Sequence, residues 1–208
     1  MGCCVRLAPA LLLLTCACAH PITITPALDA LTAPGGGRIE KSVGYYISPE
    51  NLARQVETPG GAGDNVKYFP YKESEPALQR VLSNIFSEVH PLPSPSPAEI
   101  IASKNIAYIF IPTITTDSSS CSAVCVNGFV FTAWPYCGYP WPPCAFTVSL
   151  DCRATDGAGK VIWETSFKTE AHQPWPVVKQ DHSMAGKEAI REAFLDLQDR
   201  IVKSGAFR

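Results

Sequence analysis

The stretch Phe146–Lys168 (FTVSLDCRATDGAGKVIWETSFK) carries the strongest folding signal in this chain of 208 residues. Apolar and polar residues alternate on both sides of the turn sequence Asp156–Gly159. Such alternation is typical of strands with one buried face, and a short turn rich in glycine joins two of them as a hairpin. The stretch therefore predicts an antiparallel β-hairpin. Cys152 shares the apolar face of the first strand, which predicts a buried free thiol.

Two further strands and two amphipathic helices are predicted outside the hairpin. The strands are Ser42–Ser48 and Ile106–Thr116, and the second is apolar on both faces, as an inner strand is. Helical spacing of apolar residues predicts helices at Glu75–Val89, with Ser74 as the N-cap, and at Ser183–Lys203. The order is strand, helix, strand, strand, strand, helix. It predicts a two-layer α/β (α+β) sandwich in which two helices cover a four-stranded mixed sheet.

Prolines and hydroxyl residues indicate where these elements end. The run 91–97 (PLPSPSP) follows the first predicted helix and indicates a stiff, extended connector. Pro112 lies inside a predicted strand and indicates a bulge or the end of pairing, because proline donates no backbone hydrogen bond. The polar run Thr115–Ser120 is interpreted as a solvated strand end that satisfies its own backbone.

The N-terminal sequence MGCCVRLAPALLLLTCAC is that of an export signal, with one cation followed by the apolar run Leu7–Leu14. The run is too short to span a bilayer, which needs about 20 residues. The residues Thr15–Cys18 resemble the lipobox of bacterial lipoproteins, a family in which a cysteine after a small residue is lipidated and becomes the mature N-terminus. The resemblance implies lipidation of Cys18, with Cys16 as the other candidate.

Two other interpretations of the N-terminus compete with the lipobox. The first is a plain secretory signal that is cut near Ala19. The second is myristoylation with palmitoylation, suggested by Met1–Cys4, but that motif requires Ser or Thr where this chain has Arg6. An acyl anchor in the cytoplasm also has no need of four consecutive leucines. We therefore expect an exported lipoprotein.

The predicted organisation is a signal peptide at residues 1–17, a flexible tether at 18–37 and a single domain at 38–208. The tether is predicted from its prolines and glycines. The formal net charge is −2 at pH 7, and no basic patch is present. This charge pattern argues against nucleic acid as a partner.

Residues 117–145 form an insert between the second and third predicted strands, far longer than the roughly two to five residues that a hairpin needs. The insert is rich in aromatic side chains and proline, which offer large contact area at little cost in rotamer entropy. The aromatic residues predicted to contact a partner are Phe129, Phe131, Trp134, Tyr136, Tyr139 and Trp141. The alternative is that these rings fold back over the sheet as a small satellite core.

The four cysteines of the insert are predicted to form disulfides in an oxidising compartment. These cysteines are Cys121, Cys125, Cys137 and Cys144. Nested pairs, Cys121 with Cys144 and Cys125 with Cys137, match the rungs of one antiparallel hairpin, although the other pairings remain open. Metal binding is the alternative. It is disfavoured because no C-x-x-C motif occurs and no histidine lies nearby.

The order of elements behind a lipobox is similar to that of small envelope lipoproteins, such as the lipopolysaccharide-assembly lipoprotein and the auxiliary lipoproteins of lipid-transport complexes. The segments Ser42–Glu50 (SVGYYISPE), Val66–Tyr71 (VKYFPY) and Ile111–Ser120 (IPTITTDSSS) resemble a family of uncharacterised proteobacterial lipoproteins. These resemblances imply a membrane anchor and a domain that faces the periplasm. Ala19 after the lipidated cysteine implies the outer membrane, because lipoproteins retained at the inner membrane carry aspartate there in enterobacteria.

The expected function is non-catalytic binding or scaffolding in an envelope assembly, with a protein or lipid partner. No catalytic residue, metal ligand or cofactor is predicted, because no triad order and no G-x-S-x-G motif is present. An exported enzyme of unknown reaction and a metal-binding insert are the alternatives.

Overall fold

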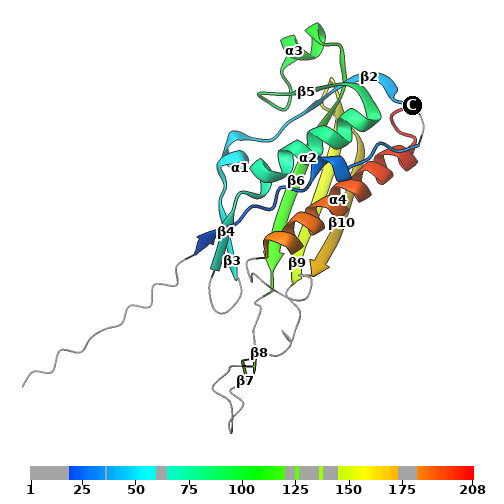
Figure 1. The fold of residues 1–208 in the computed structure, drawn as a ribbon. Helices are drawn as coiled ribbons and strands as arrows, with labels where there is room; N and C mark the ends of the chain where they lie inside the picture. The colour runs from blue at the N-terminus through cyan, green and yellow to red at the C-terminus, as the bar shows by residue number, and fades with distance from the viewer. Residues whose placement is uncertain are drawn as a thin grey trace, which may run out of the picture.

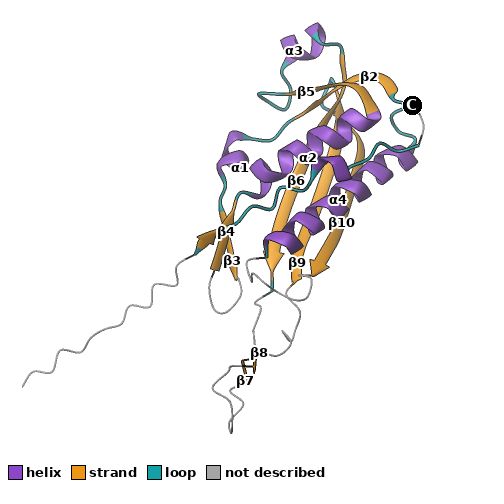
Figure 2. Ribbon diagram, viewed as in Figure 1, coloured by secondary structure: helices purple, strands orange, loops and turns teal. Residues whose placement is uncertain are grey.

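The computed structural model describes residues 19–35, 37–59, 65–119, 125–126, 136–137, 145–172 and 182–208. The main sheet in these residues has five strands in the order β10-β9-β6-β2-β5. The strands are β2 (Ile39–Tyr45), β5 (Phe86–Pro91), β6 (Ile106–Ser118), β9 (Ala145–Asp156) and β10 (Val161–His172). Helices α2 (Pro70–Ile85) and α4 (Ser183–Ser204) cover one face of this sheet (Figure 1), and Figure 2 shows the two layers by element type. The mixed α+β class is therefore confirmed.

The predicted hairpin is present as β9 and β10, which pair antiparallel. The amide of Gly159 donates to the carbonyl of Asp156 at 3.0 Å, and Gly159 has φ +83, a conformation that glycine adopts without strain. The apolar face of β9 lies under the helices, where Leu150 is fully buried. Cys152 on the same face is a buried free thiol, as predicted.

The predicted four-stranded sheet was wrong, because a fifth strand, β5, follows α2 without a loop. The helix predicted to reach Val89 ends at Ile85, and Val89 instead pairs with Val43 of β2. Pro91 explains part of this difference, since a residue that precedes proline is pushed towards extended backbone. Parallel pairing with β2 then makes the rest of Phe86–Pro91 a strand, although its apolar spacing also fits a helix.

The start of α2 also differs from the prediction, at Pro70 instead of Glu75. The Glu73 carboxylate accepts from the Phe69 amide at 3.1 Å and so satisfies a free donor of the first turn. Pro76 lies inside the helix. Ser74, the predicted N-cap, also lies inside the helix and is buried, so that prediction was wrong.

A second, smaller sheet was not predicted. It has the order β1-β4-β3 and consists of β1 (His20–Pro21), β3 (Val56–Pro59) and β4 (Asn65–Tyr68). Short elements connect or flank the two sheets. They are the 3-10 helix η1 (Leu28–Ala30), helices α1 (Pro49–Ala53) and α3 (Ala98–Ser103), and the paired strands β7 (Cys125–Val126) and β8 (Tyr136–Cys137).

Pro112 marks the end of pairing between β6 and β2, one of the two outcomes its position predicts. The register between these strands stops at Tyr45 and Phe110. Beyond that point β6 no longer bonds to β2. The Ile114 amide of β6 instead donates to the hydroxyl of Tyr71, a residue of α2, at 3.0 Å. Alternate residues of a strand point their amides to the same side, so the donor that Pro112 lacks would lie on this unpaired side.

An aromatic cluster closes the core at the C-terminal end of α4. Phe207 is 1% exposed, and its ring centroid lies 5.3 Å from that of Phe110 and 5.7 Å from that of Trp163. Gly205 has φ +67, the left-handed conformation that turns the chain back after a helix. This turn is what brings Phe207 under the sheet.

The flexible tether predicted at residues 18–37 is contradicted from His20 onwards. Residues His20–Pro34, here called the N-terminal strap, run between α2 and α4 (Figure 1). Ile24 and Leu31 of the strap are both 0% exposed and belong to the hydrophobic core. Burying one such side chain stabilises the fold by about 1.5–3 kcal/mol relative to leaving it exposed to water, as it would be in a flexible tether.

Polar side chains of both helices hold the backbone of the strap. The Asn84 amide of α2 donates to the Leu31 carbonyl at 3.0 Å and to the Gln198 side-chain oxygen at 3.0 Å. Gln198 of α4 donates in turn to the Thr32 carbonyl at 2.9 Å. Each partner satisfies another buried group, so the strap and the two helices are joined in one network.

Gly186 of α4 provides the space for Ile24. A Cβ atom at Gly186 would lie 2.5 Å from Cγ2 of Ile24, closer than such atoms approach. We expect Gly186→Ala to lower the free energy of unfolding by about 1–2 kcal/mol. Overpacking costs about 1–3 kcal/mol, and the gain in helix propensity returns about 1 kcal/mol at most. Chemical denaturation measures the change.

Two variants control this prediction. Lys187→Ala lies on the exposed side of α4 next to Gly186 and should leave stability nearly unchanged. In the double variant Ile24→Ala with Gly186→Ala, the clashing atom is gone, so the combined loss should be smaller than the sum of the single losses. Stabilisation by Gly186→Ala alone would contradict the seating of Ile24 on α4.

Candidate functional site

Several chain segments meet at one end of the domain, here called the insert end because both roots of the insert lie there. β6 and β10 finish at this end and β9 starts there, next to β1 and the β3–β4 pair (Figure 1). The backbone register places His20 beside Val66, and Val66 beside Thr58. The N-terminal strap therefore enters the domain at the same end as the insert.

Hydrogen bonds fix the small sheet to the end of β6. The Ser118 hydroxyl donates to the Pro59 carbonyl at 2.5 Å, and the Tyr68 hydroxyl donates to the Thr116 hydroxyl at 3.0 Å. The Ser119 amide donates to the Ala145 carbonyl at 2.9 Å and holds the two roots of the insert together. The polar residues at this strand end thus bond to neighbouring segments more than to their own backbone.

Three titratable side chains line part of a hollow at the insert end. This hollow beside the insert roots, about 420 Å³ in volume, is lined in part by Asp117, Glu170 and His172. His172 Nε2 lies 3.5 Å from Glu170 Oε1, and Asp117 accepts from the Ser118 amide at 2.8 Å. Among the described residues no group of three or more His, Cys, Asp or Glu could hold a metal ion.

Most of the predicted site residues lie outside the described ranges. These are Cys18, Cys121, Cys144, Phe129, Phe131, Trp134, Tyr139 and Trp141. Strands β7 and β8 contain the others, and their backbone register places Cys125 opposite Cys137 and Val126 opposite Tyr136. Opposite positions in an antiparallel pair are close enough for side chains to meet. The Cys125–Cys137 disulfide remains a prediction with a compatible register.

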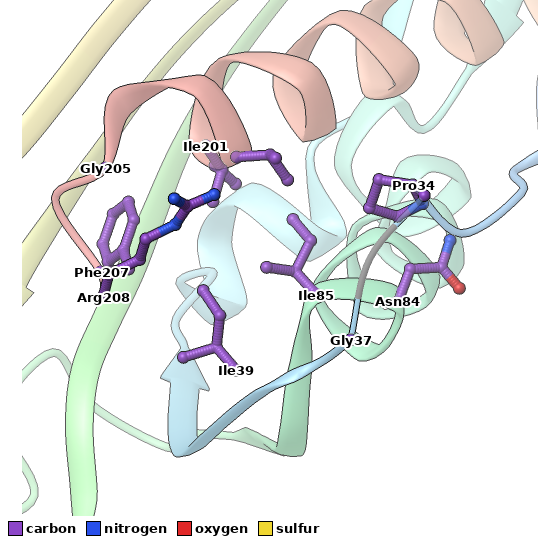
Figure 3. Close-up of a pocket in the computed structure, with 11 residues that line it drawn as sticks. Pro34, Gly37, Ile39, Asn84, Ile85, Ile201, Gly205, Phe207 and Arg208 are labelled. Carbon is purple, nitrogen blue, oxygen red and sulfur yellow. The ribbon is translucent and has the colours of Figure 1, made fainter.

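A second candidate is a cavity of about 280 Å³ beside the aromatic cluster, here called the terminal pocket. Figure 3 shows Ile39 and Ile85 between Phe207 on one side and Asn84 on the other, with the Arg208 side chain extending from beside Phe207 towards Ile201. Arg208 is the single charged side chain among its described lining residues. Ligand pockets usually have volumes of about 300–1,000 Å³, so this recess lies just below the usual range.

The titrating groups with shifted pKa values do not converge on either site. Burial, with a smaller contribution from Glu75, raises the pKa of Tyr45, whose hydroxyl donates to Glu75 at 3.1 Å. Burial also raises the pKa of Tyr68. Arg191 lowers the pKa of Glu188 through an ion pair on the exposed side of α4. These shifts follow from core packing and a helix ion pair, and within the described ranges they assemble no acid–base pair.

The strap is the feature of this end that the sequence analysis missed. Its residues Ile22-Thr23-Ile24-Thr25 alternate apolar and polar side chains, which is a strand signal. Prolines on both sides of this motif and the glycines that follow it favoured a linker instead. No helix in the described ranges has the length and apolar character needed to cross a membrane.

No protein-family model and no curated protein sequence matches this chain. Its fold is similar to that of a Xanthomonas campestris protein of the family DUF330, with a TM-score of 0.50 and 10% identity over 89% of this chain and 95% of that one. A minor lipoprotein from Acinetobacter baumannii matches 81% of this chain and 95% of its own, with 10% identity and a TM-score of 0.42. At this identity the first likeness shows the fold alone.

Cys152 offers a direct check on the core next to these surfaces. Burial raises its thiol pKa to about 12, and alkylation requires both the thiolate and access to the sulfur atom. We expect Cys152 to resist alkylation at pH 8 in the folded protein and to react fully in denaturant, as read by peptide mass mapping. The raised pKa also means that stability is lost as the pH rises from the ordinary thiol range towards about 12. Rapid alkylation of the folded protein would contradict this burial.

Proposed function

We propose that this chain is a bacterial envelope lipoprotein, lipidated at Cys18, whose domain binds or scaffolds within an envelope assembly without catalysis. The position of the strap carries the proposal. Within the described residues, strand β1 starts at His20, two residues after Cys18 in the sequence, and the first buried side chains follow at Ile22 and Ile24. Processing before Cys18 would therefore remove the export signal and leave every contact of the strap intact.

The composition of the insert supports a role in contact instead of catalysis. Between Cys121 and Cys144 the chain has no histidine, lysine, arginine, aspartate or glutamate. General acid–base catalysis needs a group that exchanges protons near neutral pH. Aromatic contact needs none, and exposed aromatic patches mark sites for partners or membranes. We infer that the six aromatic residues of the insert named above form this contact surface.

The resemblance of the sequence to auxiliary lipoproteins of lipid-transport complexes supports one kind of assembly. We propose a protein or lipid partner in such a complex, with the domain on the periplasmic side of the outer membrane. Ala19 directly after the lipidated cysteine supports the outer membrane, since aspartate at that place is the retention signal for the inner membrane in enterobacteria.

Substitution of the proposed lipid-bearing residue tests the anchor. Cys18→Ala should release the domain into the soluble periplasmic fraction, because no thioether-linked diacylglycerol can form. Partition into detergent, followed by mass measurement of the N-terminal peptide, gives the readout. Cys16→Ala is the matched control and should leave the protein in the detergent phase. If the Cys16 variant is released while the Cys18 variant stays bound, the lipidated residue is Cys16.

Substitution of two tryptophans tests the contact surface. Trp134→Ala with Trp141→Ala should weaken capture of the envelope partner at least about tenfold, because a buried aromatic anchor is worth about 2 kcal/mol or more. Crosslinked pull-down from intact cells measures capture, and Trp175→Ala serves as a control outside the insert. Cooperative unfolding should persist in the double variant. Its loss would show that the rings belong to a core, and unchanged capture would show that they touch no partner.

A further inference from the structure

The strap leaves almost no free chain between the proposed lipid and the folded domain. The amide of Ile22 donates to the Lys67 carbonyl at 3.0 Å, and the amide of Ile24 donates to the Glu73 carboxylate at 2.5 Å. Both bonds lie within six residues of Cys18 in the sequence. From Cys18 to His20 an extended chain reaches about 7 Å at most. A lipid on Cys18 would therefore hold the start of β1 close to the bilayer headgroups.

The roots of the insert lie near this attachment point. The order β1-β4-β3 puts β3 two strand spacings from β1, which is about 10 Å. The Ser118 hydroxyl bonds to Pro59 of β3, and Ser119 is paired with Ala145. From there β6 runs through the domain to Ile106, a length of about 40 Å for its 13 residues. The opposite end, where α3 lies, is correspondingly far from the attachment point (Figure 1).

We propose that the insert end is the face of the domain that docks on the bilayer surface, with β6 directed away from the membrane and α3 at the distal end. This orientation rests on the proposed lipidation of Cys18. The length of the connection sets this orientation, because the charged groups of this end include three acids (Glu57, Asp117 and Glu170) and one base (Lys67), which together offer no attraction to anionic lipid. A basic patch that would bind anionic lipid is absent from the described part of this end, so salt should have little effect on the orientation.

Exposed residues on β6 and directly after it provide labelling positions at known distances from the insert end. Thr113, Thr115 and Ser119 are exposed at successive distances from the insert end, and Lys104 is exposed at the end of α3. Thr115 lies about 14 Å and Thr113 about 20 Å along the strand from Ser119. A fluorescent amino acid is placed at one of these positions at a time in the full, lipid-modified chain. The chain is then reconstituted in phosphatidylethanolamine–phosphatidylglycerol vesicles that contain a phospholipid with a nitroxide headgroup.

Quenching by the nitroxide should be strongest at position 119, weaker at 115 and 113, and absent at 104, at both low and high salt. Equal quenching at all positions, or the strongest quenching at 104, would overturn the orientation. Flotation with vesicles and the mass of the N-terminal peptide are measured on the same samples. A chain that carries no lipid and does not float overturns the lipidation and the orientation together, whereas a floating lipoprotein without the gradient overturns the orientation alone.

A linker variant tests whether the short connection sets the orientation. Twenty Gly/Ser residues inserted between Ala19 and His20 add a coil with a root-mean-square length of about 25 Å. Flotation should persist while quenching at position 119 falls to the level at 113 or below. A gradient that survives the insertion would show that the end binds lipid by its own affinity, and it would overturn the role assigned to the short connection.

Discussion

The arrangement of both helices depends on the contact between Ile24 of the strap and Gly186 of α4. Only a glycine leaves room for the isoleucine side chain there. The network of Asn84, Gln198 and the Leu31 and Thr32 carbonyls then fixes the same strap to α2 and α4. The two helices contact each other through Asn84 and Gln198 and also share a third element, the strap.

Local patterns were sufficient for elements whose burial is repeated along their own length. The β9–β10 hairpin and α4 each show one apolar face over many residues, and their predicted bounds are close to those observed. β5 could not be predicted in this way. Phe86 and Val89 fit a helical stripe as well as a strand, and the outcome depends on pairing with β2, more than 40 residues earlier.

In the candidate site, too, some features are visible in local sequence patterns and others depend on contacts between distant segments. A cysteine in a lipobox and an aromatic insert without charged residues between Cys121 and Cys144 are recognisable from composition and spacing, and their roles remain predictions. The described segments that border them, the start of β1 and the two roots of the insert, lie at one end of the domain, and this is a property of the fold. It depends on the parallel pairing of His20 with Val66 and on the bond from Ser118 to Pro59, contacts between segments far apart in the sequence. No local pattern encodes contacts of this kind.

The strap also determines how mechanical force enters the domain. A pull on the N-terminus reaches β1 first and then Ile22 and Ile24, which lie between α2 and α4. The load therefore passes to the helical layer, while the long β6–β9–β10 ladder is loaded only indirectly. Under tension the strap would peel from its groove starting at the insert end, and the sheet would remain folded longest. The strap is thus the first part of the domain to detach when the N-terminus is pulled, and the sheet is protected until it has done so.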